Sequence, residues 1–283
     1  MRLQVRHITT YRYDRPITLG RHILRMHPRL DGAFALESFD MSVHPQPAGI
    51  SPLLDPGGNL AHEVWFQGET THEFRISYRW SGRTSPRYAW DLLPTTDVRT
   101  LPPHYGVEKS GLGPVLSTGE AVPPYALADF ARAAAIEAKR ETLPFLQILE
   151  ERIRNRLRNS WRLTGPPMDP AVTLAGGQGS CRDLAVLFIA CCRLQGVAAR
   201  FVSGYVPAGA GSAQHMHAWA EAYLTGAGWR PFDPSQTEPV GEKYVAVAAA
   251  AEPADAAPIS GYFSGSPTRS EMDVELTVET EDG

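Results

Sequence analysis

The segment that most limits how this chain can fold is the run LAVLFIACCRL at residues 184–194. It has the length of an ordinary helix and is almost entirely apolar, so it predicts a helix buried on most sides. The preceding run, GGQGSCRD, contains glycines that allow a sharp turn, and Ser180 followed by Asp183 is the pattern of a capping box. The sequence therefore predicts a buried helix that begins near Cys181.

Cys181 would lie where a cysteine becomes reactive. In the first turn of a helix, unpaired N–H groups and the helix dipole stabilise an anion, so the pKa of its thiol should fall below the reference of about 8.5. The thiolate is the nucleophilic form of cysteine. The alternative, a buried inert thiol, fits Cys191 and Cys192, which lie deep in the apolar run. Cys181 is therefore the predicted nucleophile.

Composition limits the other kinds of site and partner. The chain has 3 cysteines, two of them adjacent and none spaced as CxxC, which indicates neither a disulfide framework nor a zinc site and favours a reducing compartment. A formal net charge of -4 argues against a nucleic-acid partner. No stretch approaches the ~20 apolar residues of a membrane span, and the first residues do not resemble a secretory signal. We therefore expect no membrane association and a cytoplasmic location, and the oligomeric state stays open.

A cysteine nucleophile needs a base, and His217 is the candidate. The run HMHAWAEAYL at residues 215–224 alternates as a strand does, with His215, His217 and Trp219 on one face. Two alternatives remain open at this point. A strand histidine is more often structural than catalytic, and His215 with His217 could ligate a metal, although no carboxylate or thiol at a fitting spacing completes such a site.

Asp233 is the candidate that would orient the imidazole and fix its tautomer. It ends the run GWRPFD, which follows a turn signal at residues 225–228. Two strands joined by that turn would be antiparallel neighbours, which could bring Asp233 alongside His217. An aspartate before proline is also a common turn residue, so Asp233 alone is weak evidence. The order Cys, His, Asp on helix, strand and strand is more specific than any one member.

The chain is predicted to contain two units. Residues 1–110 hold short apolar runs broken by turn signals such as DPGGN at residues 55–59, which is typical of an antiparallel β domain. A stretch rich in Pro, Gly and Ser at residues 101–124 has the composition of a linker. Residues 124–283 then form the second unit.

Within the second unit, two helices are predicted before Cys181 and three strands after it. The Ala- and Pro-rich residues 245–258 are predicted to be an irregular loop. The alternating Val274, Leu276 and Val278 predict one last strand, assigned here to the same unit. Four arginines crowd the second helix, and we expect a solvated face there rather than an anion site: Arg152, Arg154, Arg156 and Arg158.

Four motifs in this order, GxGSCRDLA, RFVSGY, HAWAEAYL and GWRPFDPS, resemble those of the bacterial transglutaminase-like superfamily. The resemblance implies an α+β fold, with a papain-like core of helices packed on an antiparallel sheet and an antiparallel β domain before it. It also implies that Cys181 is the nucleophile, His217 the base and Asp233 the orienter. The implied reaction is acyl transfer on an amide through a thioester, of protease, amidase or transglutaminase type, without a cofactor.

The resemblance leaves two further residues with open roles. Gln178 could help the backbone N–H of Cys181 to stabilise the oxyanion. Trp161 stands where relatives often have an aromatic residue, and it could wall the site, help the oxyanion or simply pack. The substrate would be a peptide or protein amide. The competing interpretation is a non-catalytic protein-binding module on the same scaffold, which loss of a triad member would mark, and none is lost.

Overall fold

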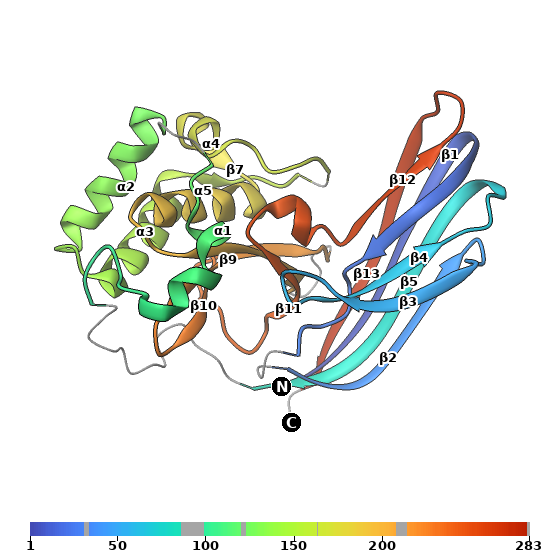
Figure 1. Cartoon of the computed structure of the whole chain (residues 1–283), viewed down its shortest axis with the longest axis horizontal. Coiled ribbons are helices and arrows are strands. Elements are labelled where there is room, and N and C mark those ends of the chain that lie inside the picture. The colour runs from blue at the N-terminus through green and yellow to red at the C-terminus, as the bar shows by residue number, and fades with distance from the viewer. Residues whose placement is uncertain (31–33, 86–98, 120–122, 163, 208–213, 282–283) are drawn as a thin grey trace.

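The computed structural model describes residues 1–30, 34–85, 99–119, 123–162, 164–207 and 214–281. Two bodies lie side by side (Figure 1): a large, strongly curved β-sheet, and a smaller sheet covered by helices. The predicted α+β class, with an antiparallel β domain and a helix-on-sheet core, is confirmed.

Among the described residues, the N-terminal sheet has seven strands in antiparallel pairs. Its main order is β2-β5-β1-β4-β3, and β12 and β13 also pair with β1. The long β1 is central because it pairs in turn with four other strands. The strands are β1 (Arg2–Leu24), β2 (Phe34–His44), β3 (Gly49–Leu54), β4 (Leu60–Trp65), β5 (Thr70–Thr84), β12 (Ile259–Ser264) and β13 (Ser270–Glu281).

Within the described ranges, the core sheet has four strands in the order β10-β9-β8-β11, all antiparallel. They are β8 (Ala199–Tyr205), β9 (His217–Leu224), β10 (Gly228–Phe232) and β11 (Val245–Ala250). The longer helices are α2 (Tyr125–Glu137), α3 (Thr142–Arg156), α4 (Pro170–Gly176) and α5 (Cys181–Leu194). The remaining short elements are η2 (Gly106–Gly111), α1 (Gly113–Leu116), β6 (Arg158–Asn159), β7 (Gln178–Gly179) and η3 (Pro253–Ala256).

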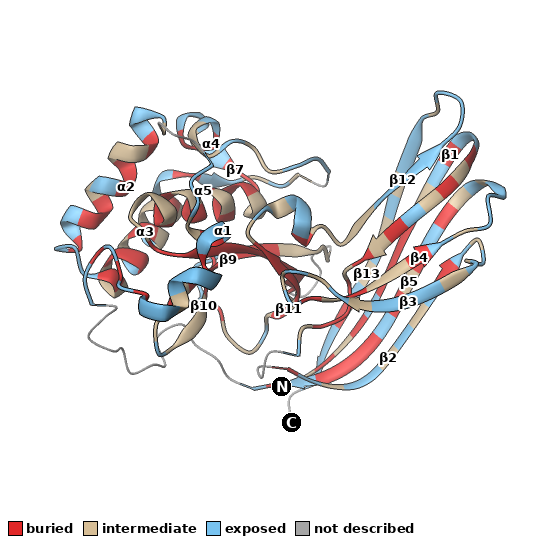
Figure 2. Ribbon diagram, in the orientation of Figure 1, coloured by how far each residue is buried: buried red, intermediate tan, exposed pale blue. Residues whose placement is uncertain are grey.

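The predicted buried helix is α5, and it begins at Cys181 as expected. Its apolar side chains share one hydrophobic cluster with the alternate alanines Ala218, Ala220 and Ala222 of β9. Because alanine is small, helix and strand can approach closely. Figure 2 shows β9 buried along most of its length. This packing sets the start of α5 beside the start of β9.

Two expectations about the end of the chain were wrong. Residues 245–258 are not an irregular loop throughout, because β11 pairs with β8 at the edge of the core sheet. The last strand does not belong to the second unit: β13 pairs with β1 from Arg2↔Glu281 to Tyr13↔Ser270. Alternation of apolar residues indicates a strand but does not say which sheet the strand joins. The boundary between the two units, predicted within residues 101–124, stays a prediction.

Arg152, Arg154 and Arg156 lie in α3, whereas Arg158 follows the helix in β6. Arg156 and Arg158 are exposed, as expected for a solvated face, and the guanidinium of Arg156 lies over the Phe130 ring. Arg152 pairs with Glu137, and Arg154 lies 3.5 Å from Glu150. Nothing in these contacts indicates an anion site.

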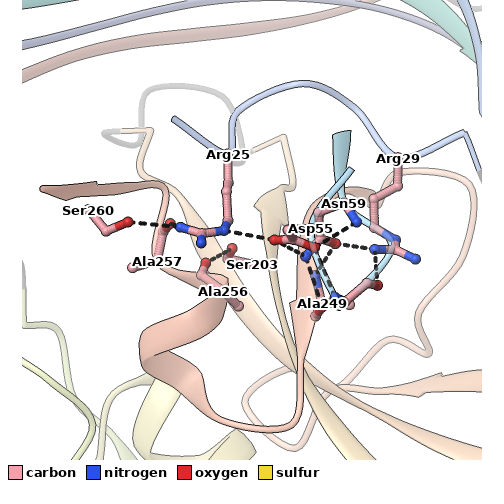
Figure 3. A network of polar contacts seen from close by, with 10 residues as sticks. Arg25, Arg29, Asp55, Asn59, Ser203, Ala249, Ala256, Ala257 and Ser260 are labelled. Carbon is pink, nitrogen blue, oxygen red and sulfur yellow. Dashed lines mark hydrogen bonds and ion pairs between the residues drawn. The ribbon is translucent and has the colours of Figure 1, made fainter. Parts of the chain in front are cut away.

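The predicted turn at residues 55–59 connects the two bodies (Figure 3). Asp55 accepts a hydrogen bond from Arg25 at 2.9 Å. The buried side chain of Asn59 donates to the carbonyl of Ala249 in β11 at 3.0 Å and accepts from its N–H at 2.8 Å. The amide thereby fills the place of a neighbouring strand along the outer edge of the core sheet.

Candidate active site

Cys181 is the first residue of α5, and a buried carboxylate fixes the chain around it. Asp183, with no exposed surface, accepts hydrogen bonds from the N–H and the hydroxyl of Ser180 at 2.8 and 2.7 Å. It also accepts from Arg162 at 2.6 Å and from the N–H of Met168 at 2.8 Å. The predicted partnership of Ser180 and Asp183 is therefore present, and it holds the thiol at a helix N-terminus.

His217 and Asp233 meet as the predicted hairpin requires. His217 begins β9, and Asp233 directly follows β10, whose last residue Phe232 pairs with Ala220. The distance from His217 Nε2 to Asp233 Oδ2 is 2.6 Å, and only 1% of the Asp233 side chain is exposed. A hydrogen bond to a buried carboxylate holds the imidazole in one orientation.

The thiol of Cys181 interacts with the same imidazole. Because Nε2 faces Asp233, Nδ1 is the ring nitrogen left for the thiol. Burial alone would raise the pKa of Cys181, but the hydrogen bond and charge of His217, with the N–H of Ala218, outweigh it and lower that pKa. Burial alone would lower the pKa of His217, but hydrogen bonds and charge from Asp233 and Cys181 raise it to about 10. Both directions favour a thiolate–imidazolium pair.

Asp233 has further partners that the sequence did not reveal. Its Oδ1 accepts from the N–H and the hydroxyl of Ser235 at 2.9 and 2.6 Å. Its Oδ2 accepts from the hydroxyl of Tyr244 at 3.0 Å, in addition to His217. Its own N–H donates to Glu150 of α3 at 2.8 Å. Hydrogen bonds and the charge of His217 outweigh burial, which alone would raise the pKa of Asp233, and keep that pKa below its ordinary value.

Ser235 could have been found, because a hydroxyl two residues after an aspartate is a common turn contact. Tyr244 and Glu150 carried no such signal, because Tyr244 comes just before β11 and Glu150 lies in α3, and neither segment was predicted to lie beside Asp233.

Gln178 and Trp161, the other two predicted site residues, make contacts with Arg158 and His215, and their roles stay predictions. The exposed Gln178 side chain accepts a hydrogen bond from Arg158 at 2.6 Å. Trp161 is 70% exposed, and its ring centroid lies 5.2 Å from that of His215. His217, not His215, is the histidine that contacts Asp233. Within the described ranges, no three His, Cys, Asp or Glu side chains are grouped as a metal site, and no described helix is long and apolar enough to cross a membrane.

The three thiols should differ sharply in reactivity. We expect iodoacetamide at neutral pH to modify Cys181 at least ~100-fold faster than Cys191 or Cys192. Cys181 is partly accessible with a lowered pKa, whereas the other two have no exposed surface and burial raises their pKa. Peptide mapping by mass spectrometry measures the three rates. In denaturant the rates should converge, and equal labelling of the folded protein would contradict the assignment of Cys181 as nucleophile.

Comparison with known sequences agrees with this architecture. The sequence model of the transglutaminase-like superfamily core matches residues 128–234, and that of the bacterial transglutaminase-like N-terminal region matches residues 3–81. An uncharacterized protein of Mycobacterium tuberculosis is 26% identical over 311 residues, covering 98% of this chain and 92% of the relative. One from Mycobacterium leprae is 33% identical over 108 residues, covering 36% of this chain and 37% of the relative.

A solved structure shares the whole fold. The crystal structure of a candidate cysteine protease from Cytophaga hutchinsonii superposes with a TM-score of 0.72 at 22% identity. The match covers 100% of this chain and 92% of that one, so both bodies are shared. The likeness to that structure shows the fold, and the two family matches, over residues 3–81 and 128–234, show that the chain belongs to the transglutaminase-like superfamily, a cysteine-based catalytic family, and carries the N-terminal region of its bacterial members.

Proposed function

We propose that this protein catalyses acyl transfer on amide bonds of a peptide or protein through a thioester on Cys181. The observation that carries the proposal is the continuous contact from thiol to imidazole to buried carboxylate, made by Cys181, His217 and Asp233. A nucleophile, a base and an orienting group in this relation are the parts that acyl transfer requires. The cytoplasmic location expected from the sequence is a separate prediction.

In the first half of the reaction, the Cys181 thiolate attacks the amide carbonyl carbon and forms a tetrahedral oxyanion. Backbone N–H groups at the start of α5 stabilise that charge. His217 then donates its proton to the leaving amine, the C–N bond breaks, and a thioester remains. Gln178 and Trp161 flank the site in this proposal, with Gln178 held by Arg158.

In the second half, a nucleophile resolves the thioester. Water gives a protease or amidase, and a primary amine gives a cross-link. In either case His217 takes the proton of the attacking group, the C–S bond breaks, and the thiolate returns to Cys181.

The pH dependence of turnover should follow the two pKa shifts. Because the pKa of Cys181 is lowered, the thiolate should already form below the ordinary pKa of a free thiol. Because the pKa of His217 is raised to about 10, the imidazolium that donates to the leaving amine is lost only as pH rises through that value. A profile of kcat/KM against pH therefore has a rising limb below the ordinary thiol pKa and a falling limb near pH 10.

A covalent probe can test the proposal before any substrate has been identified. A peptide amide analogue carrying a thiol-reactive group should modify Cys181, and mass mapping identifies the residue. A library of glutamine-containing peptides with and without a fluorescent primary amine then separates hydrolysis from amine transfer. Should no amide react while a protein partner binds native protein and Cys181→Ala equally, the binding-module interpretation replaces this one.

A further inference from the structure

The segment that leads into His217 is anchored on the N-terminal sheet. The side chain of Gln214 donates to the carbonyl of Val278 at 3.2 Å and accepts from the N–H of the same residue. Val278 lies in β13, which within the described residues pairs only with β1. The Gln214 amide therefore occupies the free edge of β13 and supplies the two hydrogen bonds that a neighbouring strand would make.

Met216 makes a second contact with the same sheet. Its side chain packs against two hydrophobic clusters that include residues of β1 and β5. His215, between them, turns to the other side and packs its ring against Trp161 of the helical body. This is the alternation of an extended chain. Residues 214 and 216 thus face the N-terminal sheet, while residues 215 and 217 face the active site.

His217 depends on this anchor because it is the first residue of β9. It pairs with Gly204 of β8, and this is the last pair between the two strands. Residues 214–216, the described residues that lead into His217, belong to no strand, so the direction in which they enter β9 depends on the contacts of Gln214 and Met216. A catalytic imidazole must be held within a fraction of an ångström, and a loosened entry would let the ring leave Cys181.

We propose that the N-terminal sheet is a working part of the active site, and that Gln214 is the positioning residue through which β13 fixes His217 between Cys181 and Asp233. The inference rests on the proposed function, because it assigns a task to the base of that reaction. It gives the β domain a role in the chemistry without contact to the substrate.

Groups from several elements surround His217. A change in the position of the ring alters the pKa of His217 and of Cys181 through its contacts with these groups. Cys181 of α5 and Asp233 after β10 contact the ring. The centroid of the Tyr244 ring, just before β11, lies 6.2 Å from the centroid of the His217 ring. Glu150 of α3 accepts a hydrogen bond from the N–H of Asp233 and pairs with Arg154. Displacing the ring weakens its contacts with Cys181 and Asp233 together, so the thiolate loses its stabilising partner and the pKa of the thiol rises.

Gln214→Leu tests this directly, because leucine has a similar size but makes neither hydrogen bond. We expect alkylation of Cys181 at a pH below the thiol pKa to slow about tenfold, which corresponds to a tenfold smaller thiolate fraction. The readout is the full pH dependence of the iodoacetamide rate, which lost stability alone would not move. Gln214→Asn keeps an amide but is one methylene shorter, so it should give a smaller slowing, and it carries the test if the leucine variant does not fold.

Asn59→Leu is the matched control. Asn59 makes the same kind of amide contact across the same interface, to Ala249 of β11. However, β11 is also held by β8 along its length, and Ala249 does not lead into His217. This variant should lower the melting temperature yet leave the alkylation profile within about twofold of native.

The outcomes separate the two proposals. If native Cys181 titrates like a free thiol, the proposed function fails. If native Cys181 has the lowered pKa but the folded Gln214 variants match it within twofold, the positioning role is wrong. An equal slowing in Asn59→Leu would also overturn it, because the effect would then be general loosening of the interface.

Discussion

Cys181→Ala is expected to abolish thioester formation and turnover. In the proposed mechanism the Cys181 sulfur forms the covalent bond, and alanine removes it; loss of the nucleophile in a comparable triad costs of the order of 10⁶ in kcat. The fold should survive, because alanine is the best helix former and is small enough for the first turn of α5. Turnover of any amide substrate found, and trapping of the acyl-enzyme by mass spectrometry, measure the effect.

Cys191→Ala provides the control for Cys181→Ala. Cys191 has no exposed surface and lies in the hydrophobic cluster beneath the site. Its truncation should cost about 1 kcal/mol in the free energy of unfolding, through a small cavity, while turnover and labelling of Cys181 persist. Full activity in Cys181→Ala would remove the thioester mechanism altogether.

The parts of the site that could be predicted from sequence are those that local chemistry dictates. Ser180 and Asp183 mark a helix start, and the apolar run behind them marks a buried helix, so local sequence alone places Cys181 at a helix N-terminus. The short turn after β9 made an antiparallel hairpin the simplest arrangement, and the hairpin carries Asp233 to His217. Each of these inferences spans fewer than about twenty residues.

The parts that could not be predicted depend on contacts between distant segments. Gln214 and Val278 are 64 residues apart, and Asn59 and Ala249 are 190 apart. Nothing in either local pattern indicates that an amide side chain completes the edge of a strand in another sheet. Likewise, the alternation of residues 274–278 fits either sheet, and the alanines of β11 resemble a low-complexity loop until β8 lies beside them. Tertiary pairing, not local propensity, decides these elements.

Asp233→Asn should lower turnover by roughly 10–10³ while keeping the shape of the site. The four donors around the carboxylate explain why. Ser235 presents its N–H and hydroxyl to Oδ1, and His217 and Tyr244 present donors to Oδ2. An asparagine has one carbonyl oxygen, and the backbone N–H of Ser235 cannot turn away, so the oxygen should face Ser235 and the NH2 group should face His217.

In that orientation, the hydroxyl of Tyr244 can accept from one N–H of the amide, but the N–H that faces His217 finds an acceptor only if Nε2 is unprotonated. The remaining ring proton then lies on Nδ1, facing Cys181, and the imidazolium is lost. The pKa of His217 should fall from about 10 towards its ordinary value, and the pKa of Cys181 should rise, so thiolate disappears at neutral pH. Thiolate absorbance and alkylation rate against pH follow this change without a substrate. Asp169→Asn is the control, since Asp169 caps α4 through the N–H groups of Ala171 and Val172, and asparagine caps equally well. A native thiol titration in Asp233→Asn would mean that the carboxylate does not hold the imidazolium, and that Cys181 draws its reactivity from the helix N-terminus alone.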